Sequence, residues 1–276
     1  MDIETQKYLK KTANTIRKDI VTEVFSAQSG HPGGSLSIVD VITYLYFKEM
    51  NVNPSAPKDP ARDRFVLSKG HTCPALYAAL AHKGFFDTKE LTSFRKLGHF
   101  LQGHPDMKHT PGIDMSSGSL GQGISAAAGM ALAGKIDGAG YRVYCALGDG
   151  EIEEGQVWEA AMFAAHYKLD NLCLIVDSNG LQIDGPVSEV MNVAPIDEKF
   201  KAFGFHVIVT DGHDFDALEK AFDQAKSVKG KPTVIVAKTV KGKGVSFMEN
   251  QVGWHGKAPN EEEYKQAMAD LAALDA

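Results

Sequence analysis

The chain has 276 residues, and its 29 Lys and Arg against 35 Asp and Glu give a formal net charge of −6. Because no basic excess is available to neutralise phosphates, a nucleic-acid partner is not expected. A hydrophobic content of 43% excludes an intrinsically disordered chain. The polar N-terminus does not resemble a signal peptide, and no apolar run approaches the ~18 residues of a membrane span. We therefore expect a cytoplasmic protein with no membrane partner.

Helix and strand patterns alternate along most of the chain. In chain order they predict helices over about 3–28 and 36–49, a strand over 64–67, helices over 73–82 and 121–137, a strand over 141–147, a helix over 154–167, a strand over 172–176, a helix over 197–203, a strand over 206–209, a helix over 214–227 and a strand over 233–238. Uninterrupted apolar strands between helices indicate an α/β fold with a parallel sheet covered on both faces. No linker or repeat interrupts the pattern, so we expect a single domain over 1–276.

The loops that follow the strands are the expected place for a ligand, because open parallel sheets bind ligands at the carboxyl ends of their strands. Gly148-Asp149-Gly150 follows one strand, and Asp177-Ser178-Asn179-Gly180 follows the next. Carboxylate and amide oxygens suit Mg²⁺ or Ca²⁺, which share such ligands with phosphate oxygens. Asp-Gly and Asn-Gly are also common turn sequences. Together, at two successive strand ends, they favour a metal–diphosphate site in which Gly150 lets the diphosphate approach the backbone.

Histidines are unusually often preceded by glycine. Five of the ten histidines directly follow a glycine, and two identical Gly-His-Pro triplets occupy 30–32 and 103–105. Each histidine alone could equally be exposed in a turn, but the clustering favours imidazoles arranged around a polar ligand, where they bind hydroxyls and move protons. His99, His104 and His109 are five residues apart and do not share a helical face, so no zinc site is expected.

Six segments together resemble the N-terminal part of transketolase, the thiamine-diphosphate enzyme that transfers two-carbon ketol units between phosphorylated sugars. The segments are SGHPGGSLS (29–37), DRFVLSKGHTCPALY (63–77), GHPDMKHTPGIDMSSGSLGQGISAAAGMA (103–131), LGDGEIEEGQVWEA (147–160), DSNGLQIDG (177–185) and WHGKAP (254–259). They occur in the family's order and cover nearly the whole chain. The GDG and Asn signals alone would indicate only the wider thiamine-diphosphate superfamily.

The resemblance implies the thiamine-diphosphate-binding fold and a cofactor site. Asp149, Asn179 and the main-chain oxygen of Leu181 match the ligands of a divalent metal, which we expect to be Mg²⁺, with Ca²⁺ or Mn²⁺ as alternatives. The positions that match contacts to thiamine diphosphate are His71, Gly150 and His255 at the diphosphate, and Gly118, Leu120 and Ile183 near the aminopyrimidine and thiazolium rings.

The resemblance also implies catalytic positions. His31 and His104 match histidines that bind donor hydroxyls and assist proton transfer, and His255 matches one near both the diphosphate and the substrate. Glu154 and Glu159 resemble interface carboxylates that connect two active sites. We count both among the catalytic candidates, and Glu154 also among the cofactor-binding ones. Two departures, Ser178 in the Asp177–Asn179 segment and Ser119 where Pro is frequent, remove no ligand.

Single-chain transketolases continue into a pyrimidine-binding domain and a C-terminal domain, which this chain does not contain. The resemblance is therefore to the N-terminal subunit of a split transketolase, and a piece of a longer chain is the alternative. It implies that the partner is a separate C-terminal subunit, that the two form an α₂β₂ assembly, and that the substrates are sugar phosphates.

The expected reaction is ketol transfer from a ketose phosphate of the xylulose 5-phosphate type to an aldose phosphate of the ribose 5-phosphate type. One alternative is the same chemistry on another sugar phosphate or acceptor. Another is a non-catalytic cofactor-binding role, against which the retention of every metal, diphosphate and histidine position argues. A metal-dependent hydrolase is disfavoured because no nucleophile–base pair is evident.

Overall fold

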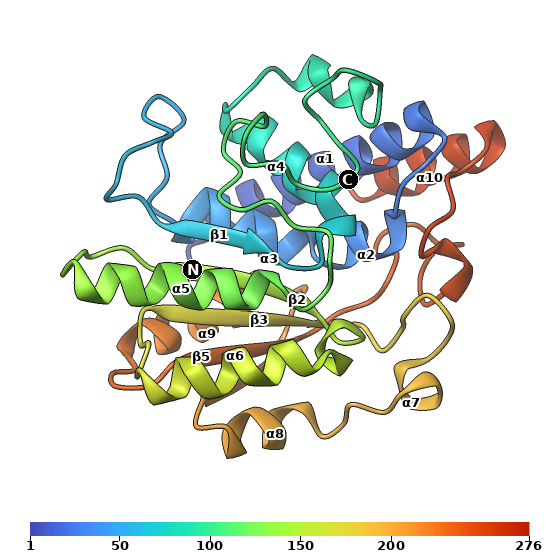
Figure 1. Ribbon diagram of the computed structural model, residues 1–276. Coiled ribbons are helices and arrows are strands. Elements are labelled where there is room, and N and C mark those ends of the chain that lie inside the picture. The colour runs from blue at the N-terminus through green and yellow to red at the C-terminus, as the bar shows by residue number, and fades with distance from the viewer. Residues whose placement is uncertain (276) are drawn as a thin grey trace.

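The central feature is one parallel sheet, seen in a computed structural model that describes residues 1–275 (Figure 1). Within that range the strands are β1 (Arg64–Leu67), β2 (Val143–Gly148), β3 (Leu172–Ser178), β4 (His206–Asp211) and β5 (Thr233–Lys238). Their order in the sheet is β1-β2-β3-β5-β4, and every neighbouring pair is parallel. The predicted α/β class is therefore confirmed.

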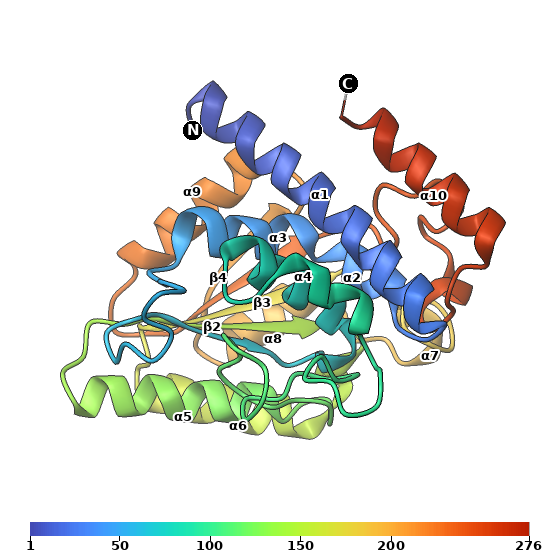
Figure 2. The same cartoon turned by 90° about the horizontal axis from the view of Figure 1, so that it is seen from above.

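Helices cover both faces of the sheet (Figure 2). The helices that pack on the first face are α1 (Ile3–Ala27), α2 (Pro32–Ser37), α3 (Val39–Tyr44), α4 (Cys73–Lys83), α9 (Phe215–Ser227) and α10 (Glu261–Ala273). Those on the second face are α5 (Gly123–Ile136), α6 (Gly155–His166) and α8 (Ile196–Ala202), with the short α7 (Val187–Val190) preceding α8. We refer to these two sides as the first and second faces throughout.

Each face has its own hydrophobic core because successive strand residues point to opposite sides of a sheet. Along β1, Phe65 and Leu67 belong to the cluster of the first face, whereas Val66 belongs to that of the second. Cys145 and Cys173 are free and fully buried in strands. The alternation leaves only the strand ends and the helix surfaces available for ligands.

The predicted helix over 36–49 differs from the structure. The chain forms α2, α3 and a π-helical turn (Leu45–Glu49) in its place. Helix α2 starts earlier because Pro32 suits the first turn of a helix. It ends at Ser37, whose hydroxyl donates to the Gly34 carbonyl oxygen at 3.0 Å and so competes with the backbone bonds of a continuing helix. The other predicted helices and strands agree with the structure to within about two residues at each end.

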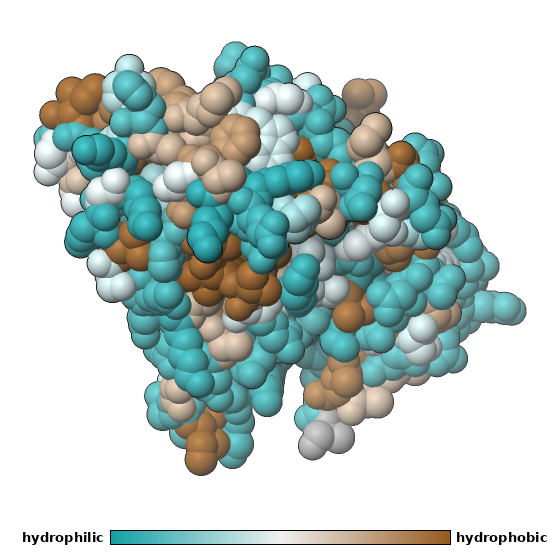
Figure 3. All heavy atoms as spheres, turned by 90° about the horizontal axis from the view of Figure 1, so that it is seen from below, coloured by the Kyte–Doolittle hydropathy of each residue, from teal (hydrophilic) through white to brown (hydrophobic). Residues whose placement is uncertain are grey.

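The long polar segment between α4 and α5 is ordered by packing. It contains a 3₁₀ helix (Thr88–Ser93), and Leu91, Phe94 and Leu101 are buried against the first-face core. A long connection held in this way is typical of a functional loop. Among residues 1–275, no helix is both long and apolar enough to cross a membrane. Seen from below, the surface is mainly hydrophilic with separate hydrophobic patches (Figure 3).

Candidate active site

A cavity of about 290 Å³ opens at the carboxyl ends of the central strands. Its lining comes from the loops after β1, β2, β3 and β5 and from the start of α2. The predicted site residues that line it are His31, His71, Gly118, Leu120, Asp149, Gly150, Asn179, Leu181, Ile183 and His255. The fold thus brings together residues that are more than 200 positions apart in the chain.

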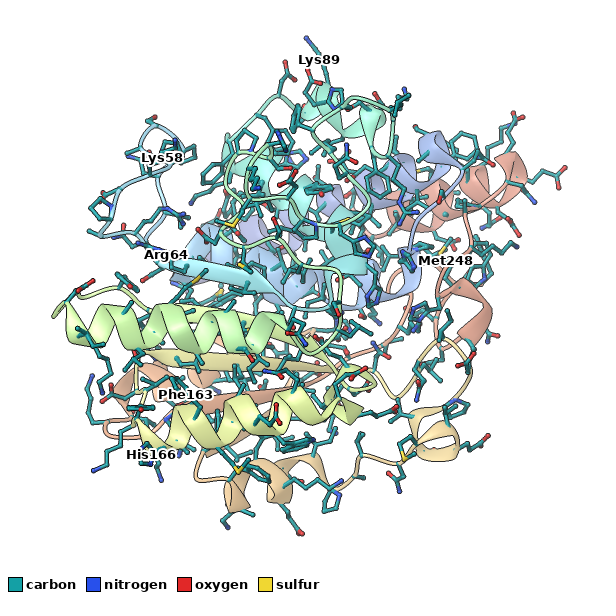
Figure 4. The ribbon with its side chains drawn as sticks, in the orientation of Figure 1. Lys58, Arg64, Lys89, Phe163, His166 and Met248 are labelled. Atoms are coloured by element: carbon teal, nitrogen blue, oxygen red, sulfur yellow. The ribbon has the colours of Figure 1, made fainter. Side chains whose placement is uncertain are left out.

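Three predicted site residues do not line this cavity. His104 lies beside it, because a Cβ at Gly118, whose φ is +153°, would stand 3.3 Å from the His104 ring. Glu154 is the exposed residue before α6. Glu159 lines a separate groove between α5 and α6 together with Phe163, which Figure 4 shows on α6 beside α5. Neither glutamate lines the cavity, although a Cβ at Gly121, next to Leu120, would stand 2.8 Å from Glu154 Cβ, and the roles of both glutamates stay predictions.

Three histidine rings meet in the cavity. The ring centroids of His31 and His71 are 5.1 Å apart, those of His71 and His255 are 5.2 Å apart, and those of His31 and His255 are 5.6 Å apart. Burial, together with neighbouring positive charge, lowers the pKa of His31 to about 4 and that of His255 to about 3. Burial also lowers the pKa of His71 well below its ordinary value. At neutral pH the three rings are uncharged, so each offers one donor and one acceptor.

Asp149 is a buried carboxylate, and among residues 1–275 no basic side chain is hydrogen-bonded to it. Its Oδ1 accepts from the Gly150 N–H at 3.0 Å, and its Oδ2 accepts from the Gly180 N–H at 2.5 Å. Burial, reinforced by the neighbouring charge of Asp177, raises the pKa of Asp149 to about 6 despite these two hydrogen bonds. A cation bound here would offset the cost of burying the charge.

Asn179 is held in one orientation by its own side-chain nitrogen. Its Nδ2 donates to Asp177 Oδ2 at 3.2 Å and to Ser37 Oγ at 3.4 Å, and its Oδ1 accepts from the Leu181 N–H at 3.1 Å. The carboxylate of Asp149, the amide oxygen of Asn179 and the carbonyl oxygen of Leu181 are thus three hard donors around one cavity. This donor chemistry fits Mg²⁺ and similar divalent cations.

Two buried lysines were not expected from the sequence. Lys69 is 2% exposed; its Nζ pairs with Asp177 and donates to the Gly34 carbonyl at 3.1 Å. Lys241 is also 2% exposed; its Nζ donates to the Leu181 carbonyl at 3.0 Å and to His255 Nδ1 at 2.8 Å. Burial and the nearby Lys69 lower the pKa of Lys241 to about 8.

These two ammonium groups make the cavity suited to an anion. A signal for Lys69 was present, since this lysine directly follows the predicted strand over 64–67. Lys241 follows the last predicted strand. Residues 239–244 around it include no carboxylate or amide side chain that would mark a metal site, so nothing in the sequence singled it out.

Glu151 fixes the loop that carries Asp149. Its Oε1 accepts from the Ser68 hydroxyl at 2.5 Å and from the Gly121 N–H at 2.9 Å, and its Oε2 accepts from the Gly148 N–H at 2.9 Å. The carboxylate is 3% exposed, and burial raises its pKa. It therefore joins the ends of β1 and β2 to the start of α5 and holds the floor of the cavity rigid.

Comparison with known proteins decides the family. Residues 8–273 match the family described as transketolase, thiamine diphosphate binding domain. The chain belongs to this family. It is 48% identical over 97% of its length to the 6-deoxy-6-sulfo-D-fructose transketolase subunit of a Clostridium species, and it covers 98% of that relative. It is 41% identical over 99% of its length to one of the apulose-4-phosphate transketolase subunits of Phocaeicola vulgatus, of which it covers 95%.

Solved structures of the family confirm the fold. The chain superposes on the transketolase of Campylobacter jejuni with a TM-score of 0.91 and 36% identity. That match covers 99% of this chain but 43% of the longer protein. The thiamine-diphosphate-binding fold inferred from the six segments is therefore confirmed.

Proposed function

We propose that this chain is the diphosphate-binding subunit of a two-chain transketolase. In this proposal it acts with a C-terminal subunit to transfer a two-carbon ketol unit from a ketose phosphate to an aldose phosphate. The observation that carries the proposal is the convergence, in one cavity, of three hard oxygen donors, two buried lysines and three neutral histidines. The full-length similarity to two transketolase subunits supports it.

Asp149, Asn179 and the Leu181 carbonyl would hold the divalent metal, for which Mg²⁺ is our first choice and Ca²⁺ or Mn²⁺ the alternatives. Lys241 donates to the Leu181 carbonyl, so its charge would lie beside both the metal and the diphosphate of the cofactor. Gly150 and His71 would contact the diphosphate. The positive charges of Lys69 and Lys241 favour the anion electrostatically in this desolvated setting.

Thiamine diphosphate, when bound, supplies a thiazolium ring that serves as the electron sink for cleavage of a carbon–carbon bond. Gly118, Leu120 and Ile183 would line the ring side, where the exposed Leu120 and Ile183 offer apolar contact. The chain's own contribution to the chemistry comes from its histidines.

His31, His104 and His255 would bind the hydroxyls of the sugar and hold or move protons. Lys241, when charged, has only donors to offer, so the His255 Nδ1 that it contacts is unprotonated and the ring proton is on Nε2. His255 therefore presents a donor at Nε2 while the ring as a whole is neutral. Neutral imidazoles of this kind suit transfer of hydroxyl protons at physiological pH.

The partner would pack on the second face, over α5 and α6. The groove between these helices is lined by Ser125, Gln156, Glu159 and Phe163. Two exposed apolar side chains continue the surface, Met162 on α6 at 55% and Tyr167 directly after α6 at 47%. In this arrangement Glu159, and Glu154 at the start of α6, would become buried at the interface, where we expect an α₂β₂ assembly.

Calorimetric titration with thiamine diphosphate and Mg²⁺ tests the cofactor site. Binding should require the metal, and Asp149→Ala should lower the affinity by at least about a hundredfold, since even loss of an outer-shell group costs 10–100-fold. Asp184→Ala, which replaces an exposed aspartate in the loop that carries Asn179 and Leu181, is the control and should bind normally. Unchanged metal-dependent binding by Asp149→Ala would contradict the assignment.

An assay of ketol transfer tests the division of labour. The purified chain should show no transfer alone and should gain it when the C-terminal subunit from the same organism is added. Robust transfer by this chain alone would refute the two-chain proposal. A non-catalytic role is tested in the same complex, since it predicts no loss of rate in His31→Gln or His104→Gln.

A second candidate keeps the reaction and changes the sugar. The 48% identical relative is named for a 6-deoxy-6-sulfo sugar and the 41% identical relative for apulose 4-phosphate, which favours a ketose other than xylulose 5-phosphate. A panel of xylulose 5-phosphate, fructose 6-phosphate, 6-deoxy-6-sulfofructose and apulose 4-phosphate with the complete complex decides between them. The donor with the highest kcat/KM identifies the physiological class.

A further inference from the structure

Arg95 has an unusual backbone conformation for its residue type. It follows the 3₁₀ helix (Thr88–Ser93) and has a φ of +60°, a region that residues other than glycine rarely occupy. Its N–H donates to the Leu101 carbonyl at 2.8 Å, which holds the turn in place. Its Nε is buried and has no hydrogen-bond partner among the described residues. Outlying backbone of this kind persists where surrounding structure enforces it, often at functional sites.

Both Gly-His-Pro triplets of the sequence meet at this guanidinium. On the side of the first triplet, Arg95 Nη1 donates to Ser29 Oγ at 2.7 Å, and Nη2 lies 3.5 Å from His31 Nδ1. On the side of the second, a Cβ at Gly103 would stand 3.0 Å from Arg95 Nε and 3.2 Å from Cζ. A larger residue at Gly103 would need the guanidinium to move by a few tenths of an ångström, so the loop that carries His104 packs directly on the guanidinium.

The chemistry of the contact determines where the proton of His31 lies. A guanidinium has five N–H donors, no acceptor, and a pKa too high for deprotonation. The His31 Nδ1 that faces it must therefore be an acceptor, and the single ring proton is on Nε2. The other charged or titratable groups near His31 are His71, His104, Lys241 and His255, and none of them forms a hydrogen bond to Nδ1 among residues 1–275.

The loop that carries His104 has a second support on α4. The Tyr77 hydroxyl lies 2.9 Å from the His104 carbonyl oxygen and 2.8 Å from the Gln102 carbonyl oxygen, and the two acceptors share its single proton. These contacts hold the backbone of the loop and do not involve the His104 ring. The guanidinium of Arg95 contacts both histidine loops and so links the position of one to that of the other.

We propose that Arg95 is a positioning residue that fixes the Nε2-protonated tautomer of His31 and seats the His104 loop beside it. In this arrangement His31 presents a hydrogen-bond donor to the cavity, which a hydroxyl oxygen of a ligand can accept. The identity of that ligand as a ketose rests on the proposed function, whereas the tautomer and the loop placement do not.

Nitrogen NMR of the histidine-labelled full chain tests the tautomer directly. His31→Gln identifies the His31 signals by their loss. The native chain should show an unprotonated Nδ1 and a protonated Nε2 for His31. Arg95→Met should shift both resonances toward values averaged over the two tautomers, and Arg95→Lys should give a smaller shift. Arg64→Met is the control, since Arg64 lies over Tyr141 at the opposite end of β1.

A protonated Nδ1 in the native chain, or unchanged His31 resonances in Arg95→Met, would overturn the proposal. If Arg95→Met does not fold, Ser29→Ala removes one anchor of the guanidinium and should produce the same shift in smaller measure. Unchanged His31 resonances in that variant would equally count against the proposal.

Kinetics of the complete complex provide the second readout. Arg95→Met should lower kcat/KM for the donor sugar at least tenfold and leave the affinity for thiamine diphosphate within twofold. An equal loss of cofactor affinity would indicate a general structural defect and overturn the positioning role. A tautomer shift in a complex that shows no ketol transfer would support the assignment of Arg95 and contradict the proposed function.

Discussion

The two faces of the sheet differ in how completely this chain covers them. On the first face, α1, α3, α4, α9 and α10 enclose a core in which Tyr44 and Phe222 are almost inaccessible to solvent. On the second face, α5 and α6 lie in front of the sheet in Figure 1 and leave apolar side chains exposed, among them Ile136 at 75% and Met162 at 55%. Exposed apolar side chains also occur on α1, with Ile3 at 71% and Tyr8 at 52%, but on the second face they accompany a groove between α5 and α6, a combination of the kind that marks interaction sites.

The difference suggests a division of roles between the faces. The first-face core supplies the stability that holds the strand ends in place, and the cavity is built where those ends meet loops from both faces. The second face is the surface on which we place the C-terminal subunit. Three substitutions test this division, and their expected effects decrease in the order given.

Phe222→Ala should destabilise the isolated chain most. The Phe222 ring is 0% exposed and stacks on Tyr44 with ring centroids 5.2 Å apart. Removing it leaves a cavity in the core and should cost about 3–5 kcal/mol of unfolding free energy. Urea denaturation of the wild type and variant measures this. The control is Phe163→Ala on the second face, where the ring is 37% exposed and a much smaller loss is expected. Equal losses would contradict the contrast between the faces.

Glu23→Met should stabilise the chain at alkaline pH. Glu23 lies on α1, is 0% exposed, and neither of its carboxyl oxygens has a hydrogen-bond partner among the described residues. Burial, reinforced by Asp19, raises its pKa well above 4.5. The folded chain therefore keeps this carboxyl protonated while the unfolded chain ionises it, so stability falls as pH rises above about 4.5.

Replacement by methionine removes that loss and should add about 1–3 kcal/mol at pH 8, with the gain shrinking near pH 4. Denaturation at the two pH values measures it, and Glu4→Met, with an 88% exposed side chain on the same helix, is the control. A gain that does not depend on pH would show that Glu23 is not buried as a neutral acid.

Phe163→Glu should weaken binding of the C-terminal subunit by at least tenfold, about 1.4 kcal/mol. Phe163 lines the groove between α5 and α6, and a carboxylate there would lose its hydration when the partner binds. Calorimetric titration of one subunit with the other measures the change. Tyr8→Glu places the same charge at a 52% exposed aromatic position on α1 and should leave association unaltered. If Tyr8→Glu weakened binding equally, the partner would not be specific to the second face.

Much of the fold could be predicted from the sequence because strands and helices here carry strong local patterns. The strands over 141–147 and 172–176 are apolar runs, and the carboxyl ends of parallel strands lie at one edge of the sheet, so Asp149 and Asn179, which follow these strands, could be expected to meet. The break at Ile38 could not, because it depends on the hydrogen bonds of one serine.

The parts of the site that were missed depend on tertiary approach. Lys241 and Arg95 are placed by loops that have no regular period, and each reaches a histidine more than ten positions away in the chain. A lysine or arginine in such a loop is ordinarily solvated, so composition gives no sign that it is buried. Spacing identified candidate metal and histidine positions but not Lys241 and Arg95, which contact two of those histidines.

The position of β5 has a consequence for the order in which the protein assembles. β5 is the last strand in the chain, yet it lies between β3 and β4 and pairs with both. Ser178 at the end of β3 and Lys238 at the end of β5 are 60 residues apart, which is roughly 3–12 s of synthesis at 5–20 residues per second. Throughout that interval the edge of β3 that will pair with β5 has unpaired backbone groups, and most of its side chains are apolar. Such an edge is a template for wrong strand pairing. The nascent chain should therefore depend on chaperones during the interval before β5 emerges.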